Sequence, residues 1–315
     1  MAALHLRLYR VGRDGEVLSA MWGRQSGAAG IEGALVPFTQ GLRWRTTFSK
    51  VLLNGPPLSF KTGSLATFPR PLHAIIVPGE QGGSTLKHDP AGGVFVYGWE
   101  EETLPDGTLK ATAPATIWAE LQALTREVLT GKQGPVQTIA IDGLHKLYDL
   151  FKGAFQWTPD LEDRGKTSGK MHDTFKNYLS LVLGSGVPQK VCTCFDGVEQ
   201  EEGKGPKYLF PGLYGYMSKE VMGYFPVVIH TEREGVGPQT KGVWRLQAVG
   251  NVQGAGLHVP PYLVKRFPAT IDVTLDRATG EVRGGWQTME KLLAAIEDEA
   301  TVPTGTIAEP PGGGA

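Results

Sequence analysis

The sequence predicts an α/β fold in which a mostly parallel sheet is flanked by helices. Short apolar segments of strand length, at residues 51–53, 73–77 and 136–141, alternate with segments of helical period. Two of those helical segments, 117–129 and 173–183, place their apolar side chains on one face. Strands that alternate with helices favour a parallel sheet covered on both faces, with ligands at the carboxyl ends of the strands.

The composition limits the class of protein. The chain has 315 residues, 41% hydrophobic and 20% charged, which is enough for one large α/β domain or two small ones. Its net charge of −1 provides no overall basic surface, so any DNA binding requires a local patch. No apolar run approaches ~18 residues, and the N-terminus lacks the pattern of a signal peptide. We therefore expect a cytoplasmic protein that does not associate with membranes.

The two cysteines, Cys192 and Cys194, lie two residues apart in one expected strand. That spacing is too constrained for an ordinary disulfide. We expect both to be small buried hydrophobic residues in a reducing compartment.

The chain divides into three regions. Residues 1–48 form an N-terminal extension in which alternating segments at 4–11 and 17–22 predict a β-hairpin. Residues 49–299 form the α/β core, and the Pro/Gly-rich residues 300–315 are expected to be a disordered tail.

Within the core, further elements follow from the same patterns. We expect strands at 190–195, 227–230, 243–249 and 271–275, helices at 143–151 and 286–299, and polar loops at 158–170 and 197–207.

A glycine- and proline-rich stretch after the first core strand is the strongest motif. Residues 55–62 read Gly-Pro-Pro-Leu-Ser-Phe-Lys-Thr, close to the phosphate-binding pattern G-x-x-x-x-G-K-[ST]. In that pattern the backbone N–H groups surround an anion, Lys61 lies on the β- and γ-phosphates, and the Thr62 hydroxyl binds Mg²⁺. The alternative is an ordinary turn between a strand and a short helix, with Lys61 in solvent.

Phe60 occupies the position of the second glycine of the motif. That position requires a backbone conformation with little steric tolerance, and phenylalanine adds a bulky side chain. The sequence therefore leaves open whether phosphate binding is retained, weakened or lost.

Two acids follow neighbouring strands. Asp142 comes directly after Ile-Ala-Ile and could hold Mg²⁺ through water opposite Thr62, or could cap the following helix. Glu80 follows the strand after the phosphate-binding motif and could orient or deprotonate an attacking water, or be a solvated loop acid. Gln81 could orient the water instead.

These segments resemble one family. Residues 55–83, with F-P-x-P after the loop and an acid followed by glycines, resemble the opening of phage-encoded RecA-like P-loop ATPases. Residues 137–151 resemble their Walker B strand and the helix after it. Residues 210–215 and 224–229 resemble a later segment, and the resemblance extends from about Val51 to Glu299.

The resemblance implies an ATP-binding RecA-like core that uses Mg²⁺, located in the host cytoplasm and assembled as a homo-oligomer. It implies that Lys61 and Glu80 are catalytic and that Thr62 and Asp142 hold the metal. The implied nucleotide-binding residues are Gly55, Pro57, Leu58, Ser59, Phe60, Lys61, Thr62 and Gly63.

The chain departs from the family at two places. Leu58 and Phe60 replace glycines of the loop, and residues 250–258 contain no Lys or Arg where the family has a candidate charge-stabilising residue.

The family engages single-stranded DNA through basic loops and aromatic residues. Lys204, Lys207 and Tyr208 are the candidates here, together with Arg164, Lys166 and Lys170 in the earlier polar loop. Neighbouring glutamates offset the charge of the first group, and solvated loops are the alternative. Two functions follow from the sequence. One is an ATP-binding phage protein acting in DNA recombination or replication, with hydrolysis left open; the other is an inactive protein of the same fold with a structural or assembly role.

Overall fold

The computed structural model describes residues 6–11, 17–19, 48–80, 83–87, 92–99, 112–156, 164–200, 206–213, 217–235, 240–247, 265–276 and 278–301. Its strands are β1 (Leu6–Val11), β2 (Val17–Ser19), β3 (Lys50–Gly55), β4 (Leu72–Ile76), β5 (Val94–Trp99), β6 (Thr138–Asp142), β7 (Gln189–Gln200), β8 (Pro206–Pro211), β9 (Val227–Glu234), β10 (Lys241–Arg245), β11 (Thr270–Leu275) and β12 (Val282–Gly284). Its helices are α2 (Lys61–Leu65), α3 (Gly83–Lys87), α4 (Pro114–Leu129), α5 (Leu144–Ala154), α6 (Arg164–Leu183), α7 (Met217–Glu220), the 3₁₀ turn η2 (Val221–Tyr224) and α9 (Trp286–Thr301).

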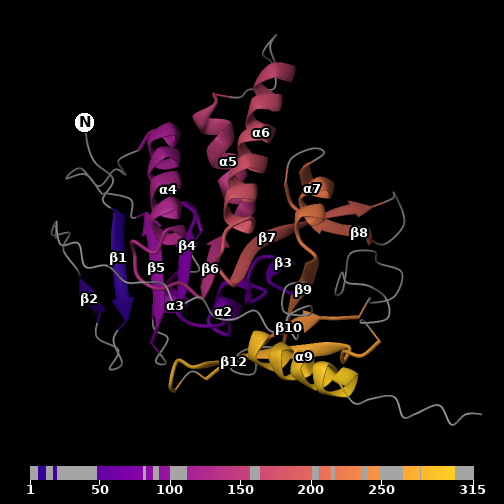
Figure 1. Cartoon of the computed structure of the whole chain (residues 1–315). Helices are drawn as coiled ribbons and strands as arrows, with labels where there is room; N and C mark the ends of the chain where they lie inside the picture. Colours follow the sequence, from indigo (N-terminus) through magenta and orange to yellow (C-terminus); the bar gives the residue numbers. More distant parts are fainter. Residues whose placement is uncertain are drawn as a thin grey trace, which may run out of the picture.

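One mixed sheet runs through the described part of the chain, in the order β12-β11-β10-β9-β3-β7-β6-β4-β5-β1-β2, with β8 paired to β7 (Figure 1). The six central strands, from β9 to β5, pair in parallel. The strands outside them pair antiparallel. The central strands are continuous apolar runs because both of their faces are buried.

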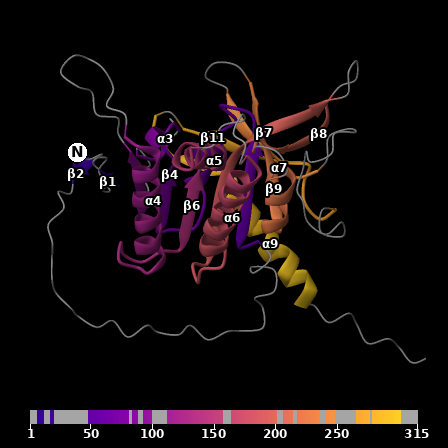
Figure 2. The same ribbon diagram turned by 90° about the horizontal axis from the view of Figure 1, so that it is seen from above.

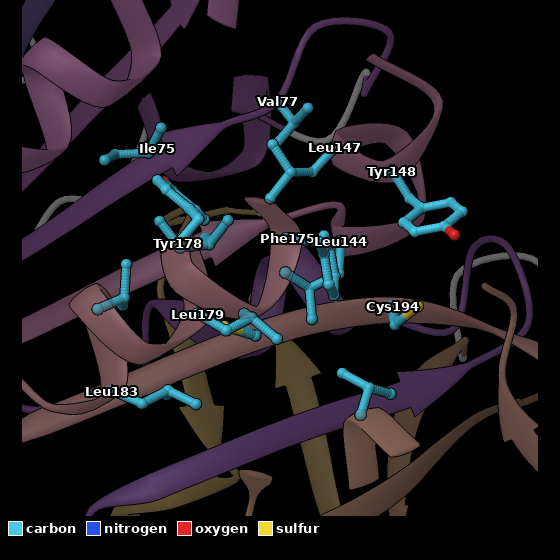
Figure 3. Close-up of a cluster of buried hydrophobic side chains, with 14 of the residues drawn as sticks. Ile75, Val77, Leu144, Leu147, Tyr148, Phe175, Tyr178, Leu179, Leu183 and Cys194 are labelled. Atoms are coloured by element: carbon cyan, nitrogen blue, oxygen red, sulfur yellow. The ribbon is translucent and has the colours of Figure 1, made fainter. Parts of the chain in front are cut away.

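Helices cover both faces of the sheet. Helices α4, α5 and α6 lie on one face, and α2, α3 and α9 pack against the other (Figures 1 and 2). On the first face, residues of α5 and α6 pack on strands β4 and β7, as Figure 3 shows for Leu147, Phe175 and Leu179. Helix α9 buries Met289, the central residue of its apolar face, in the second core.

The predicted fold class is confirmed. Strand β3, which leads into the phosphate-binding motif, lies near the middle of the sheet between two parallel neighbours, β7 and β9. Strand β6, which carries Asp142, lies beyond β7, and β4 lies beyond β6. The motif and both acids therefore come to the same edge of the parallel part of the sheet.

Three predicted boundaries are wrong. The loop expected at 158–170 is helical from Arg164, because a polar segment continues α6 toward its N-terminus, ahead of the buried residue Met171. Within the loop expected at 197–207, residues 197–200 belong to β7 and residues 206–207 belong to β8, because antiparallel pairing of these strands satisfies the backbone of a polar segment. The strand expected at 243–249 ends at Arg245.

The ends of the chain also differ from the expected regions. Strands β1 and β2 form the expected hairpin, but β1 also pairs with β5, so the hairpin extends the core sheet. Helix α9 reaches Thr301, inside the expected tail, and residues 302–315 lie outside the described residues.

Cys192 and Cys194 are both free and fully buried, as the sequence predicts. Burial raises the pKa of the Cys194 thiol to about 12, so it behaves as a small apolar side chain at neutral pH.

Candidate functional site

The loop between β3 and α2 has left-handed backbone at two non-glycine residues. Leu58 has φ +62° and Phe60 has φ +65°, and both therefore lie in the left-handed region that favours glycine. They occupy the two positions where the resembling family has glycine. Gly55 begins the loop, and a Cβ there would lie 2.2 Å from the carbonyl oxygen of Thr231. The loop thus starts where only glycine fits.

The Phe60 side chain packs toward strand β10. A Cβ built at Gly242 would lie 2.6 Å from the Phe60 Cβ and 3.0 Å from its Cγ. The aromatic ring also passes Gly63, whose Cβ would lie 3.6 Å from Cδ1 of Phe60. Glycine at 242 therefore makes room for the aromatic residue, a relation the sequence could not reveal. Leu58, in contrast, is 76% exposed.

Lys61 lies inside the loop and is only 6% exposed, so the predicted alternative of a solvated lysine is wrong. Its Nζ donates to the carbonyl oxygens of Gly55 at 2.8 Å and Pro56 at 2.6 Å, and to Ser59 Oγ at 3.2 Å. The loop is tied to β9 through Ser59, whose hydroxyl lies 2.8 Å from that of Thr231. Lys61 therefore crosses the loop rather than extending into water.

Burial lowers the pKa of Lys61 to about 8, although Asp142, Asp196 and Glu80 favour its charged form. The Lys61 ammonium also lies 4.6 Å from the centre of the Phe195 ring. An anion bound beside this ammonium would restore its charge, because it would replace the solvation that burial removes.

Asp142 lies at the end of β6, fully buried, and is held by two hydroxyl groups. Thr62 Oγ1 donates to Asp142 Oδ2 at 2.7 Å, and Thr193 Oγ1 on β7 donates to Asp142 Oδ1. Helix α5 begins after Gly143 without a side-chain cap, so the alternative role of Asp142 as a helix cap is wrong. Burial raises the pKa of Asp142, while the two hydroxyl groups oppose that shift.

The Thr62–Asp142 pair suits Mg²⁺, which prefers oxygen ligands and keeps several waters. A nearby cation would stabilise the ionised form of a carboxylate whose burial disfavours it. Among the described residues there is no cluster of three or more His, Cys, Asp or Glu side chains that could hold a metal alone. The remaining ligands would be water and phosphate oxygens.

The Glu80 side chain is mostly buried and lies against Gly143, the residue after Asp142. Its side chain is 12% exposed, so it is not a solvated loop acid, and Oε1 lies 2.9 Å from His145 Nε2. A Cβ at Gly143 would lie 2.5 Å from the Glu80 Cγ, so the alkyl part of Glu80 packs on bare glycine backbone. Gln81, the alternative candidate, lies outside the described residues.

The predicted DNA-contacting residues are only partly described. Lys204 lies outside the described residues, whereas Lys207 and Tyr208 belong to β8. Tyr208 pairs in register with Glu199 of β7. The DNA-binding prediction therefore stays a prediction.

Comparison with known proteins finds structural likeness alone. No family model matches the chain, and no curated protein is significantly similar in sequence. A KaiC-like protein from the hyperthermophilic archaeon Pyrococcus horikoshii is 12% identical over 76% of this chain and 90% of its own, with a TM-score of 0.38. The flagellar accessory protein FlaH from Methanocaldococcus jannaschii is 10% identical over 77% of this chain and 94% of its own, with a TM-score of 0.36. Both TM-scores are below 0.5, so neither structure identifies the family or activity of this chain.

Among the helices that the structure describes, none combines the length and the apolar composition of a membrane-spanning helix.

Proposed function

We propose that this chain binds ATP together with Mg²⁺ in the loop between β3 and α2. The observation that carries the proposal is the convergence of Lys61, Thr62, Asp142 and Glu80, from separate segments, at one edge of the parallel sheet. The left-handed backbone at Leu58 and Phe60 supports it, because those residues retain the loop shape that glycines normally provide. The Phe60 side chain packs toward Gly242 instead of blocking the Lys61 ammonium.

In this proposal each side chain has one role. On nucleotide binding, the Lys61 ammonium would exchange the carbonyl oxygens of Gly55 and Pro56 for phosphate oxygens. The exchange is feasible because carbonyl and phosphate oxygens both accept hydrogen bonds from an ammonium group. The Thr62 hydroxyl, which donates to Asp142, would be a metal ligand through its oxygen. Bound Mg²⁺ would supply charge neutralisation at the phosphates.

We further propose that the site hydrolyses ATP. Glu80 would accept the proton of a water that attacks the γ-phosphate in line, and Lys61 would stabilise the charge that develops there. The low exposure of both side chains supports this role, since electrostatic interactions are stronger where water is excluded.

The biological setting is proposed on the resemblance of the sequence. We propose a phage-encoded homo-oligomer acting on single-stranded DNA in recombination or replication, with Lys204, Lys207 and Tyr208 as contacts. Fluorescence anisotropy with a labelled single strand tests this, and unchanged binding by a variant with all three residues replaced by alanine would refute those contacts. The chain is expected in the host cytoplasm.

The second candidate is a protein that keeps the fold and serves a structural or assembly role in a phage. Leu58 and Phe60, in place of two loop glycines, favour it, because each pays a conformational cost that a nucleotide-binding loop normally avoids.

Nucleotide titration separates the two candidates. Calorimetry with ATP, with and without Mg²⁺, is expected to give saturable binding to the unmodified chain and none to Lys61→Ala. Absence of binding to the unmodified chain would favour the structural role. If the chain binds without hydrolysis and Phe60→Gly gains ATPase activity, the aromatic residue has disabled catalysis.

A further inference from the structure

His145 lies in the first turn of α5. Among the described residues, it is the only one at ion-pair distance from the Glu80 carboxylate. Its Nε2 lies 2.9 Å from Glu80 Oε1, and the side chains are 10% and 12% exposed. This close contact is not an aligned hydrogen bond, since neither ring nitrogen of His145 has a hydrogen-bond partner among the described residues. A buried imidazole without a hydrogen bond carries a cost, so its contact with the carboxylate requires an explanation.

The imidazole is itself held in place. Its ring stacks on Phe195 of β7, with the ring centres 3.8 Å apart and the planes inclined by 23°. The same Phe195 ring lies 4.6 Å from the Lys61 ammonium. One aromatic residue therefore contacts both the histidine that faces Glu80 and the lysine of the phosphate-binding loop.

Glu80 is restrained from a second side by Gly143. The 2.5 Å distance from a Cβ at this glycine to the Glu80 Cγ means that the alkyl chain of Glu80 lies directly on the backbone. Gly143 has φ +101° and its N–H donates to Thr193 Oγ1, the hydroxyl that also holds Asp142. Backbone packing restrains the alkyl part of Glu80, and the imidazole contacts its carboxyl end.

We infer that His145 is a positioning residue that directs the Glu80 carboxylate toward the attacking water. This inference rests on the proposed function, because it assigns Glu80 the part of general base. A general base must lie within hydrogen-bond reach of the proton it removes, and small displacements of a reacting group reduce the rate strongly. Removing the imidazole nitrogen is therefore expected to lower turnover while leaving nucleotide binding unchanged.

Two substitutions separate the nitrogen from the ring. His145→Phe keeps an aromatic ring to stack on Phe195 and removes the nitrogen, whereas His145→Gln keeps an N–H donor near the Nε2 position. We expect His145→Phe to reduce kcat by about 10- to 100-fold with the Kd for ATP changed by less than about 2-fold. His145→Gln is expected to retain kcat within about 3-fold. Equal kcat values for His145→Phe and the unmodified chain, or equal losses in both variants, would overturn the inference.

A double substitution tests whether His145 acts through Glu80. If it does, adding His145→Phe to Glu80→Gln lowers kcat no further than Glu80→Gln alone. A further 10-fold loss would assign His145 a role independent of Glu80 and overturn the inference.

A binding measurement and a spectroscopic one distinguish failure of the inference from failure of the proposed function. If the unmodified chain binds no ATP, the proposed function fails. If it binds ATP without turnover, nucleotide binding stands and the inference is overturned. Independently of turnover, Glu80→Gln is expected to shift the ¹⁵N resonances of the His145 ring. The control Glu281→Gln, next to the edge strand β12, is expected to leave those resonances unchanged. Unmoved His145 resonances in Glu80→Gln would overturn the contact itself.

Discussion

Replacing Leu58 by glycine tests whether the loop backbone is strained. Leu58 has φ +62° and is 76% exposed, so its side chain contributes little burial. A non-glycine residue in the left-handed region costs about 1–2 kcal/mol, and glycine removes that cost. Glycine also raises the entropy of the unfolded chain, which offsets about 0.4–1 kcal/mol of the gain. From the middles of these two ranges, Leu58→Gly is expected to increase the free energy of unfolding by about 0.8 kcal/mol.

Urea denaturation measures this difference, provided that the dependence of stability on urea is the same for each variant. Leu58→Ala is the matched control, because alanine also removes the exposed side chain but keeps a Cβ in the strained conformation. We expect a larger free energy of unfolding for Leu58→Gly than for Leu58→Ala. A glycine variant less stable than the alanine variant would show that the loop backbone carries no such strain.

Three further predictions follow. Gly242→Ala places a Cβ 2.6 Å from that of Phe60 and is expected to lower the free energy of unfolding, measured with urea, by about 1–3 kcal/mol. The loss should be smaller in a Phe60→Gly background, and an equal loss in both backgrounds would refute the contact. Because the pKa of Lys61 is lowered to about 8 and a bound phosphate would raise it, ATP binding at pH 8 is expected to take up about half a proton and at pH 6 almost none. Calorimetry in buffers of different ionisation enthalpy measures that uptake, and the same uptake in Lys61→Arg would contradict the assignment. Thr62→Val removes a hydroxyl that donates to buried Asp142 and is expected to weaken ATP binding in the presence of Mg²⁺ about 10-fold, and binding without Mg²⁺ less. An equal loss of affinity with and without Mg²⁺ would argue against a metal role for Thr62.

Local sequence patterns were sufficient for the central strands and for the positions of the chemical groups. The apolar runs of β3, β4 and β6 are too short for helices, and the residues that follow them meet because parallel strands end at one edge. The sequence does not predict the polar start of α6, because a polar helical turn and a polar loop have the same composition. The same limit applies to β8, whose pairing with β7 depends on a partner and not on periodicity.

The details of the site depend on contacts between distant segments. The room for Phe60 is provided by Gly242, which lies 182 positions later and has no local signal. His145 was visible in the sequence three residues after Asp142, but its contact with Glu80 requires β4 and β6 to be neighbours in a known register. Knowing the strand order would have made His145 a candidate, since its helix begins at the same edge of the sheet.

The central claim is that the loop surrounds a phosphate despite its aromatic residue. A crystal structure with a non-hydrolysable ATP analogue and Mg²⁺ tests it most directly. The account predicts triphosphate density enclosed by residues 55–62, with the Lys61 ammonium on phosphate oxygens and the Phe60 ring still against Gly242. A loop that remains closed, with Lys61 still bonded to Gly55 and Pro56 and no nucleotide density at saturating concentration, would contradict the account.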